Sequence, residues 1–193
     1  MEADWEVEIG GGAPVIDAHW PGFIDLRAFP DRISEIAEAR EFQPLANLLL
    51  RLNSNRSPLW TSKCDMWRPA EGRLACYIDL LPRDGSVFAE WKQAEAFCRD
   101  LIVRLRTAAS PASSTVPLGQ LHFVNDHTEG LEGSATLVIR EALLEDSQGF
   151  GITAYFSTDK TDLADAEKAL VGAMEAFADS VDGATFTEGP VQS

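Results

Sequence analysis

The stretch Trp60-Thr-Ser-Lys-Cys-Asp-Met-Trp67, the following Arg68-Pro-Ala-Glu-Gly72 and the run Arg73-Leu-Ala-Cys-Tyr-Ile-Asp-Leu-Leu81 decide the fold class. The first and third parts place side chains of similar character at every second position, and this period of two is typical of β-strands. The middle part carries Pro and Gly, which favour a turn. The sequence therefore predicts an antiparallel hairpin over residues 60–81.

Further elements follow this hairpin along the chain. Residues 87–106 repeat apolar side chains at helical spacing and predict the clearest helix of the chain. Residues 118–124 predict a strand, and residues 134–143 and 150–157 predict a second hairpin. A last helix is expected over about 161–181, where three aspartates lie near the positive end of the helix dipole.

The region before the hairpin predicts two strands and an interrupted helix. Residues 5–9 alternate apolar and acidic side chains, and residues 22–26 form a second short apolar stretch. An apolar stripe of helical period runs over residues 31–52, and we expect Pro44 to break it near Phe42.

This order of elements predicts an α+β fold. Hairpins make most of the strand connections, so an antiparallel or mixed sheet backed by three helices is expected rather than a parallel, doubly wound sheet. Residues 22–124 have the β-α-β-β-α-β order of a ferredoxin-like split βαβ core, with a C-terminal ββα extension. The two ββα stretches, 60–106 and 134–181, also suggest an internal duplication, which almost no residue identities support.

A chain of 193 residues is long enough for one domain with a sizeable core. We therefore expect a single domain over residues 1–193. The stretch Thr107-Ala-Ala-Ser-Pro-Ala-Ser-Ser-Thr115 is of low complexity, which makes the 107–116 loop the candidate internal boundary.

Charge is distributed unevenly along the chain. Residues 1–26 carry six acids and no Lys or Arg, residues 27–106 carry 13 bases and 11 acids, and residues 107–193 carry three bases and 14 acids, for a net charge of −15. An acidic surface repels phosphate backbones and anionic lipids, which argues against nucleic-acid and membrane partners. No apolar run approaches the ~18 residues that a membrane span needs. The start lacks a signal-peptide pattern, and three cysteines suggest reduced thiols and a cytoplasmic location.

The two faces of the predicted hairpin differ in character. One face is apolar and is expected to enter the core; it holds Ser62, Cys64, Met66, Cys76, Ile78 and Leu80. The other combines aromatic and charged side chains, a composition typical of interfaces. Its predicted interface residues are Lys63, Asp65, Trp67, Arg73, Tyr77 and Asp79. Two interpretations stay open for this face: a protein interface, most simply of a homodimer, or a surface that the chain's own N-terminal strands cover.

No catalytic signature is present, and we expect no cofactor. His122, Asp126 and His127 are residue types that bind metals, but their spacing matches no recognised metal motif, so a polar turn is preferred. If the protein is an enzyme or a small-ligand domain, its site is scattered along the chain. Asp65, Asp79, His122 and Asp126 are then the candidate residues.

The function that the sequence favours is that of a non-enzymatic binding protein with an immunity- or chaperone-like role. An acidic surface steers basic partners, so the expected partner is a basic protein or peptide. Asp159, Asp162 and Asp165 are expected to supply this attraction. A pocket with converging polar groups would favour the small-ligand alternative, whereas a flat aromatic patch ringed by charge would favour protein binding.

Overall fold

The computed structural model describes residues 15–67, 74–83, 87–109, 134–158 and 160–184. The elements in these ranges are, in chain order, β1 (Ile16–Asp17), η1 (Pro30–Glu35), α2 (Ala37–Glu41), α3 (Gln43–Leu52), β2 (Leu59–Trp67), β3 (Ala75–Pro82), α4 (Trp91–Ala109), β4 (Ser134–Leu144), β5 (Ser147–Ser157) and α5 (Leu163–Asp182).

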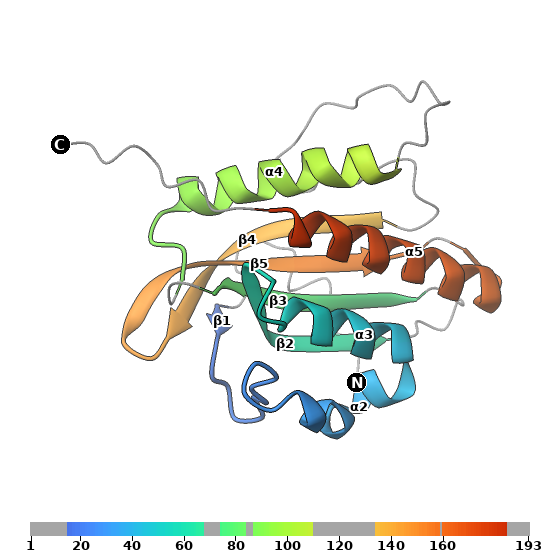
Figure 1. The fold of residues 1–193 in the computed structure, drawn as a ribbon, viewed down its shortest axis with the longest axis horizontal. Coiled ribbons are helices and arrows are strands. Elements are labelled where there is room, and N and C mark those ends of the chain that lie inside the picture. The colour runs from blue at the N-terminus through green and yellow to red at the C-terminus, as the bar shows by residue number, and fades with distance from the viewer. Residues whose placement is uncertain (1–14, 68–73, 84–86, 110–133, 159, 185–193) are drawn as a thin grey trace.

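The described strands form one curled sheet in the order β1-β4-β5-β3-β2 (Figure 1). Neighbouring strands are antiparallel except β1 and β4, which run parallel. The protein is therefore α+β with a mixed sheet, as expected. Both predicted hairpins are present, as β2-β3 and β4-β5, and a long helix follows each of them. The second strands of the two hairpins, β3 and β5, are neighbours within the sheet.

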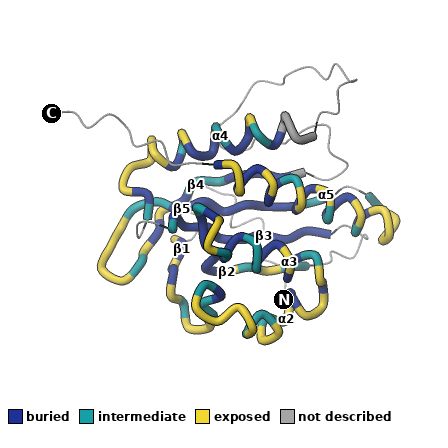
Figure 2. The backbone as a smooth tube through the Cα atoms, in the orientation of Figure 1, coloured by how far each residue is buried: buried dark blue, intermediate teal, exposed yellow. Residues whose placement is uncertain are grey.

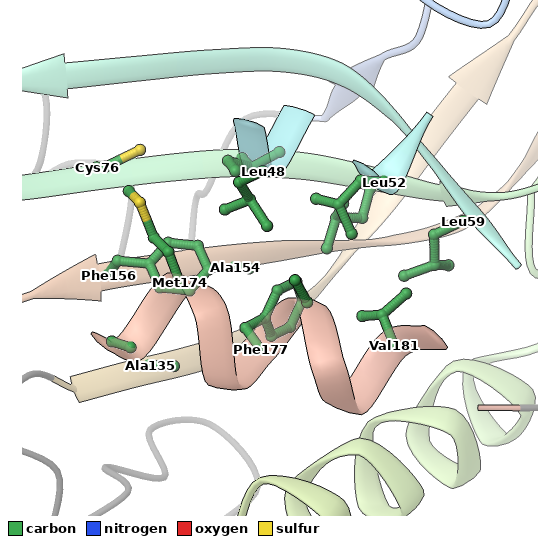
Figure 3. Packing of buried hydrophobic residues seen from close by; sticks show 14 of the residues in the cluster. Leu48, Leu52, Leu59, Cys76, Ala135, Ala154, Phe156, Met174, Phe177 and Val181 are labelled. Carbon is green, nitrogen blue, oxygen red and sulfur yellow. The ribbon is translucent and has the colours of Figure 1, made fainter. Parts of the chain in front are cut away.

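The long helices cover one face of the sheet, with α5 between α3 and α4 (Figure 1). Figure 2 shows that the strands are mostly buried and that the outer sides of the helices are exposed. The core lies between the two layers. Met174, Phe177 and Val181 of α5 point towards the sheet, where Phe177 meets Phe156 edge-on at 5.3 Å between ring centroids (Figure 3). Elements on both sides of the predicted 107–116 boundary contribute to this one apolar cluster.

The helical stripe expected over residues 31–52 has more breaks than the one predicted near Phe42. It divides into η1, α2 and α3, so the described chain has five helical elements rather than the three that were predicted. The break expected near Phe42 is confirmed, because Phe42 has extended backbone (φ −133°, ψ 92°) and Pro44 lies in the first turn of α3. A further break lies at Ile36, which is also extended.

The ferredoxin-like core is not confirmed. Residues 22–26 form turns instead of the predicted strand: the Gly22 N–H donates to the Trp20 carbonyl oxygen at 2.7 Å, and Asp25 accepts from the Arg27 N–H at 3.0 Å. These local hydrogen bonds satisfy backbone groups that a strand would pair with a neighbour. The strands predicted at 5–9 and 118–124 lie outside the described residues, as does most of the 107–116 loop.

A β-bulge interrupts β2. Thr61 lies opposite Leu80 and Cys64 lies opposite Ile78, so Ser62 and Lys63 together face Asp79. The bulge corrects the predicted face of Ser62, which lies on the same side of the sheet as Lys63. Its hydroxyl donates to the carbonyl oxygens of Asp17 and Ala18 at 3.1 and 2.9 Å.

The contact between Ser62 and Asp17 joins the two ends of the curled sheet. β1 and β2 occupy opposite ends of the strand order, yet the side chain of one bonds the backbone of the other. A second, smaller apolar cluster lies at this junction and consists of Ile16, Ala18, Trp60, Leu81 and Ala142.

Candidate functional site

The sheet face opposite the long helices carries an unusual group of buried polar side chains. Cys76, Ile78 and Leu80 of β3 enter the main core, so the alternating Tyr77 and Asp79 point to the other face. In the register of β3 and β5, Tyr77 lies opposite Tyr155 and Asp79 lies opposite Thr153. Because polar groups are costly to bury without partners, a polar layer here needs hydrogen bonds or ion pairs.

Aromatic rings form a row across three strands on this face. The ring centroids of Trp67 and Tyr77 are 6.1 Å apart, and those of Tyr77 and Tyr155 are 5.9 Å apart. Such cross-strand aromatic pairs stabilise a sheet beyond the area they bury.

Two cations flank this row. The Lys63 ammonium lies 5.7 Å from the centre of the Tyr77 ring and 6.0 Å from that of Trp20. The Arg140 guanidinium carbon lies 5.7 Å from the centre of the Tyr155 ring, and Arg140 also donates to the Tyr155 hydroxyl. Both arrangements are cation–π contacts. Arg140 is only 5% exposed, which is rare for an arginine unless it is paired or functional.

The Asp79 carboxylate and the segment from Ile16 to Trp20 complete the arrangement. Asp79 accepts from the Thr153 hydroxyl at 2.6 Å. The segment from Ile16 to Trp20 crosses the face, and the Trp20 indole donates to the Ser62 carbonyl oxygen at 3.1 Å. Beneath this segment lies a cavity of about 130 Å³. Its walls are Val15, Ile16, Asp17, Trp20, Lys63, Tyr77, Asp79, Arg140 and Tyr155.

The structure places the predicted interface residues in two groups. Lys63 and Asp65 are exposed and Trp67 is half-buried, but Tyr77 and Asp79 are buried, at 6% and 9% exposure. Of the two interpretations of this face, an open surface does not hold at Tyr77 and Asp79. Arg73 lies outside the described residues. The role of these residues in an interface stays a prediction.

Sequence reasoning missed Arg140, Tyr155 and Trp20. One signal could have found Arg140: it is the only Lys or Arg between positions 107 and 159, and it lies in a predicted strand. A lone base in an acidic stretch of alternating residues is a candidate for a specific, partly buried role. Tyr155 and Trp20 carry no comparable signal, because aromatic residues in strands and turns are common core residues.

The predicted acidic residues near α5 also have different environments. Asp162 is the N-cap of α5, and its carboxylate accepts from the backbone N–H groups of Ala164 and Asp165 at 3.0 and 3.1 Å. Asp165 is exposed in the first turn. Asp159 lies outside the described residues. Asp162 therefore has a structural role besides its charge.

The scattered site of the alternative interpretation is only partly described. Asp65 and Asp79 lie on the adjacent strands β2 and β3, and Asp65 accepts from the Met66 N–H at 2.7 Å. His122, Asp126 and His127 lie outside the described residues. Within the described ranges, no three His, Cys, Asp or Glu side chains form a group that could hold a metal ion.

Among the described helices, none has the length and apolarity that a membrane crossing requires. No protein-family model matches the chain, and no curated protein or solved structure is significantly similar to it.

Proposed function

We propose that this chain is a non-enzymatic binding protein whose acidic surface engages a basic protein or peptide, in an immunity- or chaperone-like role. A cytoplasmic location is part of the proposal; the three free cysteines support it, because thiols stay reduced there.

The observation that carries the proposal is how the basic side chains of the described structure are paired. Seven arginines have partners inside the described structure. They are Arg27, Arg32, Arg51, Arg83, Arg99, Arg104 and Arg140. The single side chain of Arg51 bonds two carboxylates, Asp179 at 2.6 Å and Asp182 at 2.8 Å. Among the described residues, exposed Asp and Glu side chains still outnumber exposed Lys and Arg side chains.

The exposed acids occur on several elements. Asp162, Asp165 and Glu175 lie on the exposed side of α5, and Glu145 and Asp146 form the tip of the β4-β5 hairpin. A surface of this kind attracts basic partners and raises their association rate.

The test is kinetic. A partner isolated from native lysate is purified, and its association and dissociation rates are measured at about 0.05 M and about 0.5 M salt. We expect the association rate to fall by roughly tenfold or more and the dissociation rate to change little. An affinity that does not change with salt would show that the acidic surface serves only solubility.

Two variants with equal charge loss locate the attraction. Asp162→Asn/Asp165→Asn removes two charges at α5 and keeps a residue that caps helices well at position 162. Glu145→Gln/Asp146→Asn removes two charges at the hairpin tip. We expect the first variant to slow association more than the second.

A second candidate function is binding of a small ligand in the cavity on the sheet face opposite the long helices. The observation that favours it is that Lys63, Asp79 and Arg140 line one cavity. The volume of about 130 Å³ has room for roughly four water molecules, so only a compact ligand would fit. A rise in melting temperature with small carboxylates or phosphate, lost in Lys63→Gln, would support this function.

A further inference from the structure

A groove of about 270 Å³ lies between α2 and the C-terminal part of β2. Its walls are Ala37, Glu38, Glu41, Phe42 and Met66. Phe42 is buried and packs in the main core, and Met66 is half-buried beside that core. The groove therefore combines an apolar wall with two carboxylates from one short helix.

The two carboxylates are close neighbours on α2. Glu38 and Glu41 are three positions apart, so they share one side of the helix, where like charges destabilise it slightly. In the part of the chain that the structure describes, neither side chain has an ion-pair or hydrogen-bond partner. Arg40 is two positions from Glu38, which places it on a different side of α2.

Among the described residues of η1 and α2, the other base, Arg32, already has a partner. Arg32 of η1 bonds both carboxylate oxygens of Glu35, at 2.8 and 2.7 Å. The negative field at the groove also reaches the sheet, because Glu38 adds to the effect of burial in raising the pKa of Cys64. Within the described ranges, the groove thus presents two carboxylates without ion-pair partners beside an apolar surface.

The geometry points to this groove as the docking site for a lysine or arginine side chain of the basic partner. These two side chains have an apolar stem and a cationic head, which matches the two halves of the groove. The stem would lie on Met66 and Phe42, and the head would lie between Glu38 and Glu41. This inference rests on the proposed function, and it adds a specific anchoring point to a general attraction.

The probes that test it are capped single amino acids. Nα-acetyl-lysine methylamide and its arginine equivalent are titrated into protein labelled with ¹³C at the methionine methyl groups. The Met66 methyl reports on the groove, and the Met174 methyl, which is only 2% exposed, reports on the core. We expect the Met66 signal to shift saturably and the Met174 signal to stay in place.

Matched controls separate charge from apolar contact. Nα-acetyl-norleucine methylamide has the stem without the charge, and we expect it to bind at least about fivefold more weakly than the lysine probe. Glu38→Gln/Glu41→Gln should weaken the lysine probe by a similar factor, whereas Glu145→Gln/Asp146→Asn, with the same charge loss elsewhere, should not. If the Met174 signal of Glu38→Gln/Glu41→Gln differs from that of the wild type, the core has changed. The single variant Glu41→Gln, at an exposed position, then takes its place.

Three results would overturn the inference: no Met66 shift with the lysine probe, equal binding of the norleucine probe, or unchanged binding by the glutamine variant. None of these bears on the salt dependence of partner association. The docking site can therefore fail while the proposed function holds. Conversely, the lysine probe could bind in the groove while the partner's association kinetics do not change with salt. That pair of results would contradict the proposed function alone.

Discussion

The three thiols show how burial sets the chemistry of single residues. Burial raises the pKa of Cys98 to about 12 and is the largest cause of the rise to about 12 at Cys64. Cys76, which is fully buried, also has its pKa raised by burial and then by the nearby Cys64. All three are free. Thiolate, the reactive form, is therefore scarce in the folded protein.

We expect iodoacetamide at pH 8 to label the folded protein slowly at all three positions and the unfolded protein quickly. The measurement is the mass of the intact protein over time, with and without denaturant. Cys64, which is half-buried, should react first among the three. Rapid, complete labelling without denaturant would contradict the buried environment.

Cys98 also predicts a loss of stability at high pH. Its folded-state pKa of about 12 lies above the ordinary value of 9.0. The neutral thiol therefore stabilises the fold fully below pH 9, and this contribution disappears as the pH rises towards 12. We expect the difference in unfolding free energy between the wild type and Cys98→Ala to shrink by on the order of 1 kcal/mol by about pH 10. Urea titrations at several pH values measure it, and a constant difference would contradict the assignment.

At the scale of the element, the N-cap of α5 gives the clearest prediction. We expect Asp162→Ala to lower the unfolding free energy by about 1 kcal/mol, because two backbone N–H groups lose their acceptor. Asp162→Asn should keep most of the stability while removing the charge. Denaturant titrations compare the two. Equal losses in both variants would show that charge at the helix dipole matters and that the hydrogen bonds do not.

Elements with a clear period could be predicted from the sequence, and irregular ones could not. The β2-β3 hairpin, both long helices and the break near Phe42 follow from alternation, helical spacing and Pro44. The bulge at Ser62 and Lys63 leaves no mark in the alternation, because both residues are polar. Residues 22–26 are mostly apolar, as in a strand, but the preceding Pro21 and the side chain of Asp25 within the stretch favour turns.

The candidate site was predictable only in part, because it is assembled from distant strands. Lys63, Tyr77 and Asp79 were found from the two-residue period of one hairpin. Arg140 and Tyr155 come from the other hairpin, and they reach the site only because β3 and β5 are neighbours. A pattern within one hairpin cannot predict which other strand lies beside it.

At the scale of the whole molecule, the homodimer stays a prediction, but fewer residues than expected can form its interface. Because Tyr77 and Asp79 are buried, only Lys63, Asp65 and Trp67 of the described interface residues remain available to a second copy. We expect Trp67→Ala to lower the dimer fraction in sedimentation at high protein concentration. A wild-type protein that sediments as a monomer at every concentration would contradict the dimer.

The contact between β1 and β2 affects how the sheet unfolds locally. The segment from Ile16 to Trp20 contains the outer strand β1, which pairs with the edge of β4, and it also bonds Ser62 at the edge of β2. Exposed strand edges promote association between sheets, and here one segment shields two of them. Local unfolding of that segment would release both edges in a single cooperative event. Hydrogen exchange should therefore show the amides of Ala18 and its neighbours on β4 and β2 opening with one common free energy.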